Sequence, residues 1–107
     1  MDRIEQLLDL MKSSDRDSFL QHALALEYIK AGTDSKAEVL FFEILEQDPG
    51  YVGSYYHLGK LLERAGRSAE AISVYQRGVE EAQKAKDLHA ASELRGALEN
   101  LEEDFDS

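Results

Sequence analysis

The sequence predicts an all-α protein built from repeated pairs of helices, and three observations lead to this class. Apolar residues recur at helical spacing along most of the 107 residues, a length that fits one domain. A 34-residue pattern occurs twice in the middle of the chain. The chain carries one proline and seven glycines, fewer turn-forming residues than a small all-β domain normally needs.

Composition and charge exclude several classes of protein. No cysteine is present, which excludes a disulfide scaffold, a thiolate metal site and a cysteine nucleophile. The formal net charge of −10 argues against binding to nucleic acid, whose phosphate backbone favours basic patches. The longest apolar runs, at 23–26 and 39–42, hold four residues, far below the roughly 20 that span a bilayer. Since no targeting segment is recognisable either, we expect a cytoplasmic protein that does not bind a membrane.

The internal repeat relates residues 18–51 to residues 52–85 by a shift of 34 positions. Five positions are identical after the shift: Leu24 and Leu58, Ala31 and Ala65, Gly32 and Gly66, Ala37 and Ala71, and Glu46 and Glu80. Others are conservative, such as Phe41 with Tyr75. The matched positions fall where two helices would touch and at the turn between them, so each repeat is expected to fold as a helix pair.

Each repeat carries signals for the start and end of its helices. Capping boxes, in which a hydroxyl residue and a Glu or Gln three positions later satisfy the first free N–H groups, are expected at both starts in the first repeat. They pair Ser18 with Gln21 and Ser35 with Glu38. A left-handed Gly32 is expected to end the first helix and Pro49 the second. In the second repeat, Gly66 repeats the first stop, and Ser68 is the expected cap of the following helix.

The two ends of the chain are expected to cap the repeats. Residues 1–17 are interpreted as a half-unit with one helix, capped by Asp2 with Glu5. Residues 86–107 are interpreted as a capping helix and acidic tail, with Asp87 as its cap. The apolar stripe of this last helix comprises Leu88, Ala91, Leu94, Leu98 and Leu101. Together the segments predict a single domain of six helices, with breaks near Ser14, Gly32, Pro49, Gly66 and Lys86.

The repeats resemble the tetratricopeptide repeat family, whose pattern reads W-x2-L-G-x2-Y, then A-x3-F, then P. The second repeat follows this pattern at Tyr55, Leu58, Gly59, Leu62, Ala71 and Tyr75, and the first at Leu24, Tyr28, Ala37, Phe41 and Pro49. Gln21, Ala25 and Gln83 depart from it. The resemblance implies a right-handed stack of antiparallel helix pairs with N- and C-terminal capping helices. It also implies non-catalytic protein–protein interaction, with the first helix of each unit lining the concave side.

Candidate binding residues lie on the first helix of each repeat. The helix that starts near residue 18 carries a second apolar stripe beside its packing face, made of Phe19, His22, Leu26 and Ile29. The resemblance and the 34-residue shift place Tyr56, Lys60, Glu63 and Arg64 at the concave positions of the second repeat, with Lys30 extending the charged row. These residues predict a groove that is apolar at one end and charged at the other. The alternative is that the apolar stripe packs against the N-terminal or the C-terminal helix.

The expected function is that of a small adaptor, scaffold or assembly factor that binds a peptide or helix of another protein. The second repeat holds five basic against four acidic residues, so Lys60 and Arg64 are expected to meet acidic groups of the partner. The alternative is a self-association module, a homodimer in which another copy occupies the groove. No enzyme activity, cofactor or metal site is expected: His89 and Glu93 have a spacing that could hold a metal, but no further ligand has a matching one.

Overall fold

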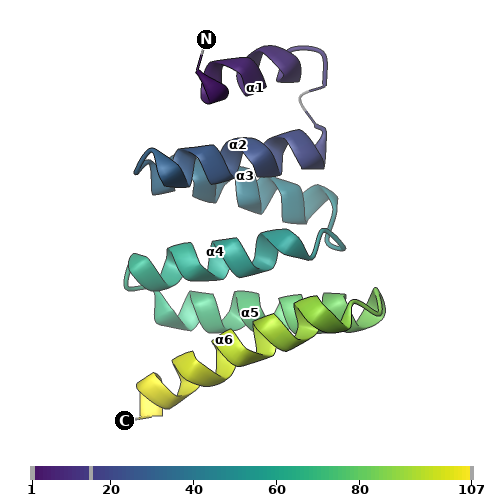
Figure 1. Ribbon diagram of the computed structural model, residues 1–107. Helices are drawn as coiled ribbons and strands as arrows, with labels where there is room; N and C mark the ends of the chain where they lie inside the picture. The colour runs from purple at the N-terminus through teal and green to yellow at the C-terminus, as the bar shows by residue number, and fades with distance from the viewer. Residues whose placement is uncertain (1, 15, 107) are drawn as a thin grey trace. The chain divides into compact units, whose positions relative to one another are not determined.

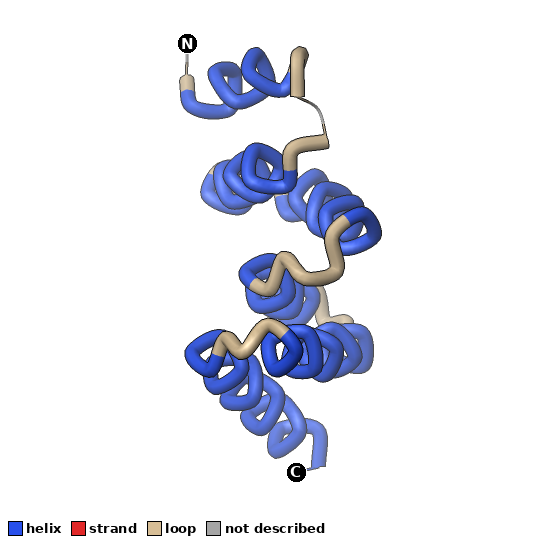
Figure 2. The backbone as a smooth tube through the Cα atoms, turned by 90° about the vertical axis from the view of Figure 1, so that its right-hand side faces the viewer, coloured by secondary structure: helices blue, strands red, loops and turns tan. Residues whose placement is uncertain are grey.

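Six helices make up the chain in the computed structural model, which describes residues 2–14 and 16–106, without the side chains of 105 and 106 (Figure 1). They are α1 (Arg3–Met11), α2 (Ser18–Lys30), α3 (Asp34–Gln47), α4 (Gly53–Arg64), α5 (Ser68–Lys84) and α6 (Leu88–Asp106). The described residues contain no strand, and short loops join the helices (Figure 2). The predicted all-α class and the predicted breaks are confirmed, whereas the division into segments 1–17, 18–51, 52–85 and 86–107 stays a prediction.

The helices form two compact units. The first unit, residues 1–48, holds α1, α2 and α3, and α2 packs against both of the others. The second unit, residues 49–107, holds α4, α5 and α6. In this unit α5 packs against α4 and along α6, which crosses it at an angle and also reaches α4 (Figure 1).

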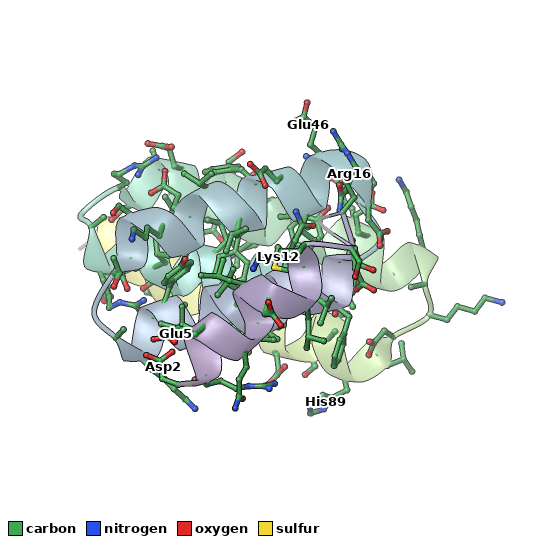
Figure 3. The ribbon with its side chains drawn as sticks, turned by 90° about the horizontal axis from the view of Figure 1, so that it is seen from above. Asp2, Glu5, Lys12, Arg16, Glu46 and His89 are labelled. Atoms are coloured by element: carbon green, nitrogen blue, oxygen red, sulfur yellow. The ribbon has the colours of Figure 1, made fainter. Side chains whose placement is uncertain are left out.

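Aspartate side chains cap α1 and α6. The Asp2 carboxylate accepts a hydrogen bond from the Glu5 backbone N–H at 2.8 Å, and both side chains lie at the start of α1 (Figure 3). Asp87 caps α6 in the same way, by accepting from the Ala90 N–H at 3.0 Å. Both caps were predicted from the sequence and are confirmed.

The predicted cap of α2 is wrong by one residue. Asp17, and not Ser18, is the N-cap, because its carboxylate accepts from the Leu20 N–H at 3.1 Å. A carboxylate directly upstream of the serine is already placed at the positive end of the helix dipole. Ser18 therefore becomes the first helical residue, and its hydroxyl oxygen accepts from the side-chain amide of Gln47 at 3.2 Å instead.

The predicted serine caps of α3 and α5 are also wrong. The N-cap residues are Thr33 and Arg67, and neither makes a side-chain capping hydrogen bond. The reason is the turn before each helix. Thr33 and Arg67 directly follow a left-handed glycine, so the chain becomes helical before Ser35 or Ser68 can take the cap position.

The predicted glycine stops are confirmed and use the same hydrogen bonds in both units. Gly32 and Gly66 each have φ of +76°. After each glycine, a backbone N–H returns to a carbonyl five residues back: Thr33 to Tyr28 at 2.8 Å and Arg67 to Leu62 at 2.9 Å. This is the bond pattern of a Schellman motif, which requires a left-handed residue and therefore favours glycine. Lys86, with φ of 58°, takes the corresponding place after α5.

In each unit an aromatic residue and a small residue occupy equivalent buried positions of the helix pair. In the second unit, a Cβ added to Gly59 would lie 2.1 Å from the Tyr75 ring, so only glycine allows this approach. The first unit has Ala25 and Phe41 at the equivalent positions. The side chains of Ala25, Phe41 and Tyr75 are fully buried. In the second unit the aromatic ring thus fills the space beside the small residue.

Gln21, which departs from the repeat pattern, is buried through polar rather than apolar contacts. It is 3% exposed, and its side-chain oxygen accepts from the amide of Gln47 at 2.7 Å. Its own amide donates to Glu43 at 3.4 Å. At the equivalent position of the second unit, Tyr55 is buried and its hydroxyl donates to the Pro49 carbonyl at 2.6 Å. Both solutions satisfy the buried polar atoms.

The α6 stripe differs from the predicted one at its first residue. The buried residues are Ala91, Leu94, Ala97 and Leu101. Leu88 was expected among them but is 78% exposed. Side chains on a helix lean toward its N-terminus, so the first residue of α6 leans back over the turn rather than onto the neighbouring helices. Ala97 was not predicted, and it takes a place beside the half-buried Leu98.

Candidate interaction groove

The candidate binding residues of the first unit lie along α2, and they differ in exposure. Phe19 is 68% exposed. His22, Leu26 and Ile29 are half-buried. The His22 ring lies edge-on to Phe41, with 5.8 Å between ring centroids, so this residue takes part in the packing of α2 on α3. Phe19 is thus the member of the predicted stripe with the largest exposed fraction.

Lys30, expected to extend a charged row, is exposed at the end of α2. Its ammonium lies 3.2 Å from the Glu27 carboxylate, one turn earlier on the same helix. Exposed pairs of this kind add little to stability, so the ammonium can exchange partners at small cost.

In the second unit, α4 brings together three of its four predicted residues. The Lys60 ammonium lies 5.6 Å from the centre of the Tyr56 ring and 3.7 Å from the Glu63 carboxylate. Glu63 also accepts a hydrogen bond from the Tyr75 hydroxyl, and burial together with this bond raises the pKa of Tyr75. Arg64, the fourth residue, is exposed at the end of α4.

A hollow of about 280 Å³ adjoins Tyr56 and Lys60, and its other wall comes from α6. The residues contributed by α6 are Ser92, Glu93, Gly96, Ala97 and Asn100. The sequence analysis had interpreted α6 as a cover for the repeat and had not assigned it to the groove. Small and polar residues at 92, 96 and 100 follow helical spacing, and this is the signal that could have identified the wall.

A second hollow, of about 220 Å³, is also lined by Tyr56. Its lining includes Gly53 and His57 from α4 and Glu93 from α6. We refer to the two hollows, which share Tyr56 and Glu93, as the α4–α6 groove.

His57 lies at the floor of the α4–α6 groove. Burial lowers the pKa of its imidazole below 6.5, and Arg64 acts in the same direction, whereas the Glu93 carboxylate opposes them. The ring is therefore uncharged at neutral pH. The groove thus combines a neutral aromatic floor with one cation, one carboxylate and the amide of Asn100, a set that can recognise both the backbone and the side chains of a peptide.

Comparison with known proteins gives the family. A tetratricopeptide repeat family model matches residues 28–98. The chain belongs to the tetratricopeptide repeat family. The resemblance stated from the sequence is confirmed, and the helix-pair architecture described above is that of the family.

Solved tetratricopeptide repeat structures agree with the fold. The crystal structure of a tetratricopeptide repeat domain protein from Salinibacter ruber is 45% identical, with a TM-score of 0.78 over 80% of this chain and 97% of that one. A solution structure of a tetratricopeptide repeat domain protein from the same organism has the same identity and TM-score and is covered over 87% of its length. A Bordetella parapertussis protein, 24% identical, has a TM-score of 0.83 over 97% of this chain and 90% of that one, which shows the fold alone. No curated protein matches the chain.

The tetratricopeptide repeat is generally a non-catalytic fold for protein–protein interaction, and the chain is to be understood in that frame. Within the described residues, no three side chains of His, Asp or Glu are grouped so that they could hold a metal ion. His89 lies 3.9 Å from Glu93 and projects into solvent (Figure 3). No helix in the described part of the chain is long and apolar enough to cross a membrane.

Proposed function

We propose that this tetratricopeptide repeat protein is a non-catalytic adaptor that binds a segment of another protein in the α4–α6 groove. The observation that carries the proposal is the half-buried Tyr56 ring, which lines two hollows whose other walls come from α6. Both hollows are smaller than the roughly 300–1,000 Å³ of a typical small-molecule site. They suit single side chains of a peptide or helix that lies across Tyr56.

The chemistry of the groove favours a partner with acidic groups. Lys60 is held over the Tyr56 ring and faces the groove, where a partner carboxylate would replace Glu63 as its ion-pair partner. Glu63 would keep its hydrogen bond from Tyr75 after this exchange, so its charge would not be left without a donor. Arg64, one residue further, would add to the attraction at longer range.

Aromatic side chains in a largely desolvated setting commonly dominate binding energy, so Tyr56 is the expected anchor. Asn100 and Ser92 on α6 offer hydrogen bonds to the backbone of the bound segment. The contribution of the first-unit residues, Phe19, His22, Leu26, Ile29 and Lys30, to binding of the same partner stays a prediction.

The test uses peptides selected from a random display library on the full chain. Tyr56→Ala should weaken binding of a selected peptide by about 2 kcal/mol, roughly 30-fold. Lys60→Glu should weaken it most at low salt, because charges are screened less there. Gln76→Ala, an exposed change on α5, is the control and should leave the affinity unchanged. If neither groove variant alters binding of peptides that do bind the chain, the proposed function is wrong.

A further inference from the structure

Helix α3 exposes an apolar surface that the repeat itself does not require. Val39 is 58% exposed and Phe42 is 43% exposed, and the two lie one turn apart on the helix. The 34-residue shift places Ser73 and Gln76 at the same positions of α5, where both are also exposed. Because polar residues serve the fold at these positions, the apolar pair on α3 needs another explanation.

A groove lies directly beside Val39 within the first unit. It has a volume of about 540 Å³, and its walls are Leu8 and Met11 on α1 and Val39 and Leu40 on α3, over a floor from α2. Lys36 is the one charged residue among those that line it, and its ammonium lies 5.5 Å from the centre of the Tyr28 ring. The groove is distinct from the α4–α6 groove of the second unit.

The form of this groove fits a helix. Leu8 and Val39, one on each wall, are 44% and 58% exposed, so the walls are open to solvent and do not enclose an occupant as a small-molecule site does. Leu8 and Met11 on α1 are three residues apart, and on α3 Lys36 lies three residues before Val39, so each wall forms a ridge that can interdigitate with the ridges of another helix. The occupant is therefore an amphipathic helix with large apolar side chains at the same spacing.

Charge complementarity favours α3 of a second copy as this helix. Lys36 and Glu43, seven residues or two turns apart, lie on the same exposed face of α3 as Val39. If two α3 helices pack antiparallel about a point between Val39 and Leu40, Lys36 of each copy faces Glu43 of the other. Among the side chains that the structure describes, α3 alone exposes two large apolar residues at helical spacing.

We propose that two copies of this chain associate about a two-fold axis through antiparallel packing of α3, with each α3 lying along the groove of the other copy. The arrangement is isologous, so every favourable pair occurs twice. The net charge of −10 opposes association, so we expect a dimer whose population rises with protein concentration. This proposal does not depend on the function of the α4–α6 groove.

Sedimentation equilibrium of the full chain, in a series reaching about 1 mM, tests the proposal. We expect a monomer–dimer equilibrium. Lys36→Glu and Glu43→Lys should each raise the dissociation constant about tenfold or more, because each creates two like-charge pairs. The double variant should return close to the original value. Arg77→Glu, at the position of α5 equivalent to Glu43, changes the net charge as Lys36→Glu does; it is the control and should raise the dissociation constant far less.

Cysteine cross-linking provides an independent readout, because the chain has no cysteine of its own. Under mild oxidation, Val39→Cys should form a disulfide-linked dimer, and Ser73→Cys, at the equivalent position of α5, should not. A monomer at every concentration overturns the proposal and leaves the groove for a helix of another protein. A dimer that is insensitive to both charge reversals, or that the double variant does not restore, also overturns it.

Discussion

Replacing Gly59 by alanine is expected to strain the contact between α4 and α5. A Cβ at this position would lie 2.1, 2.5 and 2.7 Å from three carbons of the Tyr75 ring, far inside van der Waals contact. The ring is fully buried, and its hydroxyl donates to Glu63, so it cannot move aside without losing that bond. The repeat register alone suggests the opposite, since the first unit has Ala25 at the equivalent position.

The expected magnitude follows from three contributions. Overpacking of a core costs about 1–3 kcal/mol, and the upper end applies to a clash this close. Loss of the Tyr75 hydroxyl bond adds about 1 kcal/mol. Alanine in place of glycine within a helix returns about 1 kcal/mol. Gly59→Ala should therefore lower the free energy of unfolding by about 2–3 kcal/mol, and the melting temperature by roughly 10 °C or more.

Urea unfolding followed by circular dichroism measures this change, and Gly96→Ala is the matched control. A Cβ at Gly96 meets no atom within 4 Å, so the same substitution there should stabilise the protein by up to about 1 kcal/mol. The two variants should move the midpoint in opposite directions. If Gly59→Ala is neutral or stabilising, the close approach of α4 and α5 at this residue has been misjudged.

Three further changes test other parts of the structure. Burial lowers the pKa of His57, so the unfolded chain binds the proton more tightly than the folded one. The free energy of unfolding should therefore fall as the pH drops from about 7.5 through 6.5 and on through the pKa of the folded protein. Urea titrations at several pH values measure this slope, and His57→Gln should flatten it. Lys86 has a left-handed φ of 58°, so Lys86→Gly should raise the free energy of unfolding by about 1 kcal/mol, and an unchanged midpoint would argue against strain there. Deletion of residues 87–107 exposes the α5 surface that α6 covers and should cost at least about 3 kcal/mol or cause aggregation; a truncated chain that melts like the full one would contradict the capping role of α6.

The helix pairs could be predicted because their packing residues recur in register. Leu24 with Leu58 and Phe41 with Tyr75 occupy the same positions of a 34-residue repeat, and all four are buried. The glycine stops were equally accessible, since a left-handed residue is required at that point of the turn. The packing positions and the glycine stops depend on residues at fixed spacings in the sequence, so the sequence pattern is enough to predict them.

The helix starts were harder to predict, because a cap depends on how the chain leaves the preceding turn. Ser35 and Ser68 have the right chemistry for a cap, yet they lie inside their helices, since the chain becomes helical immediately after the left-handed glycine turn. Asp17 competes with Ser18 for the same N–H groups and takes the cap position. The local sequence indicates which residues could be the N-cap, and the geometry of the preceding turn decides which of them is.

The wall that α6 contributes to the candidate groove could not be predicted from the repeat. The 34-residue pattern ends before α6, so no register relates Ser92, Gly96 and Asn100 to the earlier units. Their place beside Tyr56 depends on how α6 crosses α4 and α5, which tertiary packing decides. Likewise, the pairing of Lys60 with Glu63 requires side-chain positions that spacing alone does not give.

The central claim is that the chain binds a protein segment in the α4–α6 groove, and amide chemical-shift mapping tests it most directly. A peptide selected on the full chain is titrated into the ¹⁵N-labelled protein. The largest shifts should cluster at Tyr56 and Lys60 on α4 and at residues 92–100 of α6, and the Tyr56→Ala variant should need roughly 30-fold more peptide to show them. Shifts confined to α1 and α3, with α4 and α6 unaffected at saturation, would contradict the claim.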